Sequence, residues 1–149
     1  MTLMRYRVTM ACVIVLALMM TRGASSAEPV AVIVNPANPI SILAIEEVKK
    51  YYSDIISMWP NREHINILDL PMDDTTREMF SRKVLGRNPE DVMMEWASKR
   101  ITNTANNPPM TIKSPVLVQS WVATQKWAIG YIPVSMVDPT KVKVVLTIH

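Results

Sequence analysis

The sequence has very few of the residues on which several kinds of protein chemistry depend. It contains one cysteine, two histidines and three glycines in a chain of 149 residues. The cysteine, Cys12, lies in the N-terminal segment Met1–Ala27, so the rest of the chain has no disulfide, no thiolate nucleophile and no cysteine metal site. Neither His64 nor His149 has carboxylates around it at the spacing of metal ligands, so we expect no metal site.

The sequence also lacks a recognisable catalytic set. Paired acids occur at Glu46–Glu47 and Asp73–Asp74, but no histidine, serine elbow or glycine-rich loop accompanies either pair. Acidic residues are common at helix starts because they interact favourably with the helix dipole, which explains both pairs. We therefore expect no enzyme activity and no cofactor.

The net charge of +3 comes entirely from the segment Met1–Ala27. Three of the 16 basic residues lie there, at Arg5, Arg7 and Arg22, together with no acid. The remainder has 13 basic and 13 acidic residues and is neutral. A nucleic-acid-binding protein needs a basic face, so we do not expect this chain to bind nucleic acid.

The same N-terminal segment has the three-part pattern of a secretory signal peptide. A basic stretch, positions 1–7, precedes an uncharged apolar run at positions 8–20, and Ser25 and Ala27 stand at the −3 and −1 positions of a cleavage site. The apolar run is short for a membrane span, although an uncleaved anchor is the alternative. A lipoprotein needs a cysteine after the apolar run, whereas Cys12 lies inside the run, so lipidation is not expected. The pattern predicts a signal peptide over residues 1–27, export to the periplasm, and one mature domain, residues 28–149.

Strand-like and helix-like patterns alternate along this domain, which predicts an α/β fold with a sheet covered by helices. The expected strands are residues 29–35, 64–70, 127–133 and 141–148. The expected helices are residues 42–52, 74–85, one that Asn88 caps, and 114–124.

Several side chains have an expected position within these elements. Alternation in the last strand puts Val142, Val144, Leu146 and Ile148 on one face and Val145 on the other. Apolar residues at helical spacing include Ile42 in the first helix, Met93 in the third, and Leu117 and Trp121 in the fourth. The four tryptophans could form a stacking platform for a carbohydrate or base, but their spacing favours core packing.

A set of short motifs then occurs in a familiar order. The motifs are Val32-Ile-Val-Asn-Pro-Ala-Asn-Pro39, Leu43-Ala-Ile-Glu-Glu-Val48, Tyr51-Tyr-Ser-Asp54, Trp59-Pro-Asn61, Arg77-Glu-Met-Phe80, Val84-Leu-Gly86, Trp96, Pro108-Pro109 and Ala128-Ile-Gly-Tyr-Ile132. Together they resemble the small, single-lobe relatives of the substrate-binding protein of the phosphate ABC transporter. The resemblance covers roughly residues 30 to 148. It implies one lobe of a type II periplasmic binding protein, with a mixed sheet flanked by helices.

The sequence departs from these relatives at several positions. Ala44 stands where they carry Ser or Thr as a helix cap, although Ser41 offers a cap one turn earlier. Asp54, Arg62 and Asn103 replace glycines. Asp and Asn tolerate the left-handed conformation that glycine supplies, whereas Arg62 requires a different turn.

The resemblance also implies where a ligand would bind. Full-length phosphate binders hold their anion between two lobes, on a Ser-Gly-Thr loop that opens a helix and on an arginine. The matching stretch, residues 72–78, keeps Thr75, Thr76 and Arg77 but has lost the glycine and gained two acids, and no second lobe is expected. We predict an anion site formed by Thr75, Thr76 and Arg77 together with Asn35 and Asn38, at the carboxyl ends of the strands. An ordinary capping segment and a rigid loop are the alternatives.

Two functional hypotheses follow from this site. The first is an exported solute-binding protein that reversibly binds phosphate or another small oxyanion without catalysis. The second is an interaction or signalling module that has lost the ligand and docks on a membrane transporter or sensor. An exported hydrolase is the least supported alternative. The sequence leaves the oligomeric state open.

Overall fold

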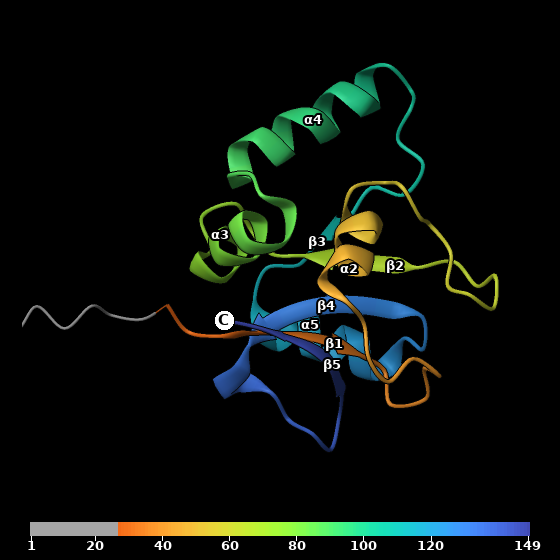
Figure 1. Ribbon diagram of the computed structural model, residues 1–149, viewed down its shortest axis with the longest axis vertical. Coiled ribbons are helices and arrows are strands. Elements are labelled where there is room, and N and C mark those ends of the chain that lie inside the picture. The colour runs from red at the N-terminus through yellow and green to blue at the C-terminus, as the bar shows by residue number, and fades with distance from the viewer. Residues whose placement is uncertain (1–26) are drawn as a thin grey trace, which may run out of the picture.

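The computed structural model describes residues 27–149, and Figure 1 shows how the elements are arranged. The predicted signal peptide lies outside the described residues, apart from Ala27. The elements are β1 (Val30–Val34), α2 (Ile45–Tyr52), β2 (Asn66–Asp69), α3 (Thr75–Phe80), the π-helix η1 (Ser81–Leu85), α4 (Pro89–Ile101), β3 (Met110–Thr111), α5 (Pro115–Thr124), β4 (Ala128–Pro133), the 3₁₀-helix η2 (Val134–Met136) and β5 (Lys143–Ile148).

The strands form a five-stranded mixed sheet in the order β3-β2-β4-β1-β5. Strand β2 runs parallel to both β3 and β4, whereas β1 runs antiparallel to β4 and β5. All five residues of β1 are buried, as expected for a strand with a neighbour on each side and cover on both faces. The mixed sheet flanked by helices confirms the predicted fold class.

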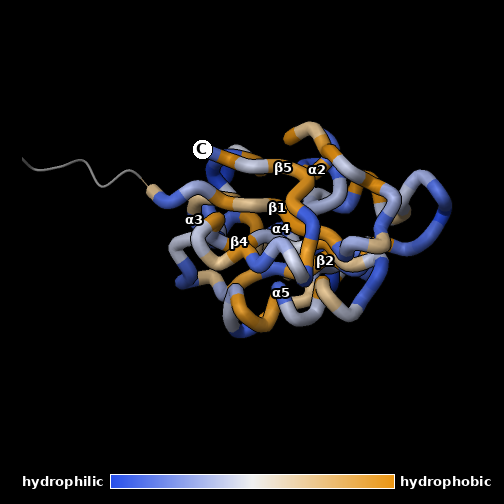
Figure 2. Tube along the Cα trace, turned by 90° about the horizontal axis from the view of Figure 1, so that it is seen from below, coloured by the Kyte–Doolittle hydropathy of each residue, from blue (hydrophilic) through white to orange (hydrophobic). Residues whose placement is uncertain are grey.

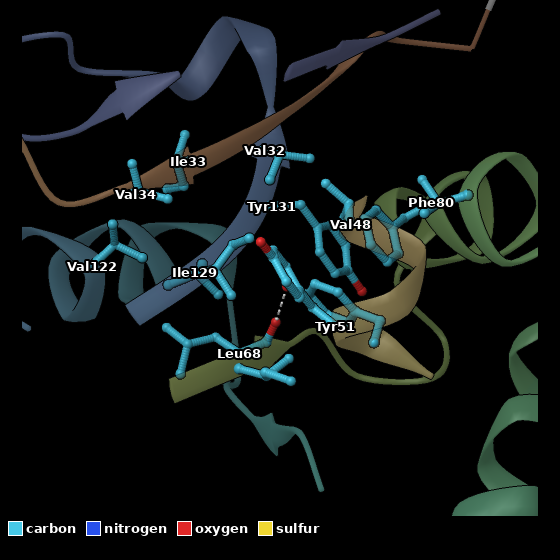
Figure 3. Close-up of a cluster of buried hydrophobic side chains, with 14 of the residues drawn as sticks. Val32, Ile33, Val34, Val48, Tyr51, Leu68, Phe80, Val122, Ile129 and Tyr131 are labelled. Atoms are coloured by element: carbon cyan, nitrogen blue, oxygen red, sulfur yellow. Dashed lines mark hydrogen bonds between the residues drawn. The ribbon is translucent and has the colours of Figure 1, made fainter. Parts of the chain in front are cut away.

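Helices cover both faces of the sheet. A Cβ at Gly130 of β4 would point at Val118 and Val122 of α5, so α5 packs on that face. The next residue, Tyr131, points to the opposite face, where its ring stacks on Phe80 of α3 with centroids 3.9 Å apart. The ring of Tyr52, from α2, meets both rings edge to face. Figure 3 shows buried side chains of this core, with Phe80 and Tyr131 toward one side and Val122 of α5 toward the other.

Helix α4 lies apart from most of the sheet. Figure 1 shows it beyond α3 and β3, at the end of the molecule opposite β5. Only Pro89, Val92 and Trp96 among its residues are buried. In Figure 2 the strongly hydrophilic stretches lie at the periphery, in the connecting loops.

Most predicted helix ends are found, although α2 begins at Ile45 and the helix predicted over 74–85 continues after Phe80 as the π-helix η1. The Asn88 side chain accepts from Asp91 N at 2.8 Å, and Gly86 ends η1 with φ of 71°. Ala44 is the N-cap of α2 and offers no acceptor. The Glu47 carboxylate instead accepts from the Ala44 amide at 2.8 Å, so half of a capping box remains and Ser41 is not the cap.

The alternation predicted for the last strand is wrong. Val145 is buried, whereas Val144 is 37% exposed. The pairing with β1 shifts between Val32, which faces Leu146, and Ile33, which faces Val144, so Val145 is the extra residue of a β-bulge. A bulge changes which side chains face the core, and no period-two pattern can show it.

Four apolar residues that the helical spacing assigned to inner stripes are exposed. Ile42 precedes α2, which begins three residues later than predicted, and it is 81% exposed. Met93 of α4 is 44% exposed, and Leu117 and Trp121 of α5 are 45% and 41% exposed. The contacts of α5 with the sheet come instead from Val118 and Val122, both fully buried. Core packing is therefore wrong for Trp121, while Trp59 and Trp96 are buried as expected.

Among residues 27–149, three non-glycine residues have a positive φ. They are Asp54 (65°), Arg62 (67°) and Asn103 (56°), the three positions at which the sequence departs from glycine. Arg62 therefore adopts the left-handed conformation that glycine favours, although a different turn was expected there. This conformation costs a residue with a Cβ about 1–2 kcal/mol.

Candidate functional site

The two halves of the predicted anion site lie at opposite ends of the strands of the sheet. Asn35 and Asn38 follow the carboxyl end of β1, and Thr75 to Arg77 follow that of β2. Because β1 is antiparallel to β4 and β2 is parallel to β4, these two carboxyl ends point in opposite directions. The prediction that all five residues form one crevice is therefore wrong.

Asn35 and Asn38 have structural contacts instead. The Asn35 amide nitrogen donates to the carbonyls of Val122 and Ala123 at 2.9 Å, and its oxygen accepts from Ala37 N. The Asn38 side chain accepts from Ile40 N and donates to Lys126 O. Both side chains are buried, and they attach the loop after β1 to the end of α5. The rigid-loop alternative describes this segment.

The start of α3 already has a carboxylate on its amides. Asp74 is the N-cap, and its Oδ1 accepts from Thr76 N at 2.8 Å and from Arg77 N at 3.4 Å. These amides are the donors that an anion at this helix start would need. Asp74 is one of the two acids gained in this stretch, and it accepts from the amides that an anion would need. Thr75 and Thr76 therefore belong to an ordinary helix-capping segment, which was the alternative to an anion site.

The Arg77 guanidinium is buried and engaged. Its Nη2 lies 3.2 Å from Asp69 Oδ2, and its Nη1 donates to Leu70 O at 2.7 Å. The two side chains are only 8% and 12% exposed. Arg77 Nε is buried and has no hydrogen-bond partner among residues 27–149. Breaking such a pair leaves a buried charge, which typically costs about 3–5 kcal/mol.

Asp69 also links Arg77 of α3 to Tyr131 of β4. Its Oδ1 accepts from the Tyr131 hydroxyl and from Leu70 N, while the Tyr52 hydroxyl donates to Leu68 O at 2.8 Å. Burial raises the pKa of the Asp69 carboxyl, although Arg77, Tyr131 and the Leu70 amide each lower it. Burial and the nearby Asp69 charge raise the pKa of Tyr131 well above its usual value. Tyr131 therefore keeps its proton and donates it to the hydrogen bond.

A cavity of about 320 Å³ lies beside this network, at the carboxyl ends of β2 and β3. We call it the strand-end pocket. Its polar lining comes from Asp69, Arg77, Arg100 and Thr111. Its apolar lining comes from Pro71, Met72, Met93, Trp96 and Pro109. The carboxyl ends of parallel strands are where open α/β sheets bind ligands, and the volume is within the range of small-molecule sites.

Arg100 supplies the free charge of the strand-end pocket. It lies in the last turn of α4, and its guanidinium makes no ion pair or hydrogen bond within the described part of the chain. Arg77 is neutralised by Asp69, so the three charged groups of the lining sum to +1. Sequence patterns did not single out Arg100, since helix-end cations are common and its neighbour Thr111 comes from a strand that was not predicted.

No feature of residues 27–149 suggests a metal site or a membrane span. No group of three or more acidic, histidine or cysteine side chains is arranged to hold a metal ion there. Within the same range, no helix has the length and apolar character needed to cross a bilayer.

Several solved structures of transport binding proteins have a similar fold. The chain is similar to an ABC-type phosphate transport receptor from Vibrio cholerae, with 20% identity and a TM-score of 0.63 over 79% of this chain and 45% of that one. It is also similar to a protein of Clostridium perfringens, assigned as a phosphate ABC transporter substrate-binding protein and solved with bound phosphate. That match has 23% identity and a TM-score of 0.64 over 79% and 44% of the two chains. The described residues therefore share the fold of part of these binding proteins.

A third similar structure, PstS from Borrelia burgdorferi, has 15% identity and a TM-score of 0.62 over 79% of this chain and 46% of that one. The chain thus spans less than half the length of the binding proteins that it matches. No family model and no curated protein matches the sequence. The resemblance stated from the motifs is therefore confirmed at the level of the fold.

Proposed function

We propose that this chain is an exported, non-catalytic binding protein that holds a small anionic ligand reversibly in the strand-end pocket. The observation that carries the proposal is Arg100, an unpaired cation at a cavity of about 320 Å³ beside the carboxyl ends of β2 and β3. The fold supports a binding role because the structures that share it are transport receptors. A membrane transporter or sensor that recognises the loaded protein is the partner this role implies, and the periplasm is its place.

A second function has one specific observation in its favour. Asp74 occupies the amides of α3 and Asp69 occupies Arg77, so the donors expected to bind phosphate are used inside the chain. An interaction module that has lost its ligand would have this arrangement. The two functions differ in whether the strand-end pocket binds any solute.

Calorimetric titration of the purified protein with phosphate, sulfate and small carboxylates separates the two functions. The solute-binding proposal expects binding of at least one anion in the micromolar to millimolar range, on the order of −8 to −4 kcal/mol. It expects Arg100→Gln to weaken this binding at least tenfold. Lys50→Gln is the matched control, because Lys50 is an exposed cation of α2 outside the pocket. Absence of all binding, or equal weakening by both variants, would favour the interaction module.

A further inference from the structure

The charges of the strand-end pocket match a ligand with a single negative charge. Arg77 and Asp69 form a buried pair at 3.2 Å and leave no net charge between them. Arg100 is the remaining charge of the lining, and the described residues give it no partner. A dianion would leave one charge without a counter-charge in a partly desolvated site, which is costly.

The rest of the pocket is apolar and too roomy for a bare oxyanion. Met72 and Met93 are 40% and 44% exposed at its wall, and the buried indole of Trp96 lies beside them. The volume of about 320 Å³ is within the range of small-molecule sites. Methionine side chains adapt to varied apolar shapes, so this wall suits carbon rather than phosphate oxygen.

The hydrogen-bond donors that a tetrahedral oxyanion needs are also occupied. The amides of Thr76 and Arg77 donate to Asp74, and Arg77 Nη1 donates to the Leu70 carbonyl. Within residues 27–149, the donors without a partner on the lining are the guanidinium of Arg100, the hydroxyl of Thr111 and the buried Nε of Arg77. The exposed guanidinium of Arg100 suits a planar carboxylate, because a guanidinium can hold its two oxygens side by side.

We propose that the ligand of the strand-end pocket is an amphipathic monoanion. Its carboxylate-type head binds Arg100, and its apolar body packs against Met72, Met93 and Trp96. This inference rests on the proposed binding function and specifies its ligand class. Inorganic phosphate, the ligand in one structure of the same fold, is a poor ligand for this chain.

Four probes test the two parts of the ligand separately, by titration monitored in two-dimensional NMR spectra. Hexanoate has both the charge and the apolar body, acetate has only the charge, 1-hexanol has only the body, and inorganic phosphate is the bare oxyanion. We expect hexanoate to bind at least tenfold more tightly than each of the other three. We also expect the largest shift among the tryptophan indole signals at Trp96, and none at Trp121 of α5, which lies outside the pocket lining.

Three variants assign the contacts. Arg100→Gln should weaken hexanoate binding at least tenfold and leave 1-hexanol binding unchanged. Met93→Ser should weaken hexanoate binding several-fold and leave acetate binding unchanged, and its side chain is exposed enough for the fold to persist. Lys50→Gln should change neither, since Lys50 carries the same charge away from the pocket.

The outcomes separate the inference from the function on which it rests. Phosphate that binds as tightly as hexanoate, with loss in Arg100→Gln, overturns the amphipathic ligand and leaves anion binding in place. Equal affinity for 1-hexanol and hexanoate overturns the required charge. Hexanoate binding that Arg100→Gln does not change overturns the site. No binding of any probe at millimolar concentration overturns both proposals.

Discussion

Replacing Gly130 by alanine is expected to lower the free energy of unfolding by about 1–2 kcal/mol, through overpacking of the core. Gly130 is a buried residue of β4, and a Cβ there would lie 2.5 Å from Cγ1 of Val118 on α5. Valine in a helix has one strongly preferred rotamer, so Val118 cannot turn its methyl group aside. Overpacking of this kind costs about 1–3 kcal/mol, and alanine regains about 0.5–1 kcal/mol relative to glycine in a strand.

The reasoning is tested by a double-mutant cycle in urea, followed by tryptophan fluorescence. Val118→Ala removes the clashing methyl group and should itself destabilise the chain, because Val118 is fully buried. If the clash is the cause, the double variant should lose at least about 1 kcal/mol less than the sum of the two single variants. Strictly additive losses, or a Gly130→Ala protein as stable as the parent, would show that α5 is not seated on β4 as described.

Three further predictions concern a titrating group, a strained turn and export. Burial raises the pKa of folded Asp69 above its unfolded value near 3.9. The folded state then holds the proton more tightly, and this carboxyl's contribution to stability falls as pH rises above about 4. Urea melts from pH 3 to 7 should show the stability of the parent falling relative to that of Asp69→Asn, and a relative rise would mean that the Arg77 pair outweighs burial. Arg62→Gly should raise the free energy of unfolding by about 0.5–1 kcal/mol, because it relieves a left-handed arginine at φ of 67°; equal or lower thermal stability would contradict this. Intact mass of the exported protein should correspond to a chain that begins at Glu28, and a retained Met1 in a membrane fraction would refute the predicted cleavage.

Local features of this chain were predictable because they depend on few neighbouring residues. The buried run of β1, the Asn88 cap and the left-handed Gly86 are each specified within a single turn or strand. The left-handed conformations of Asp54 and Asn103 also follow from residue type and local context. The fold class followed from the order of such elements and from the motifs.

The candidate site was not predictable to the same degree, because strand direction and pairing are not local properties. Asn35 and Arg77 each follow a strand. Only the antiparallel direction of β1 shows that the two residues lie at opposite ends of the strands. The bulge at Val145 and the two-residue strand β3 likewise depend on partners far along the chain. Without β3 the pocket that joins Arg100 to Thr111 could not be seen.

The central position of β1 has a consequence for the order in which the chain can fold. Val30, in the first strand, pairs with Pro133 of β4 and with Ile148 of β5. The middle of the sheet therefore cannot close until residues more than a hundred positions later are available. Pairing over such sequence separations is slow, because a large loop entropy must be overcome before the contacts form. During synthesis the apolar β1 segment has no strand to pair with until β4 and β5 have been made, so it stays exposed and prone to aggregation until then.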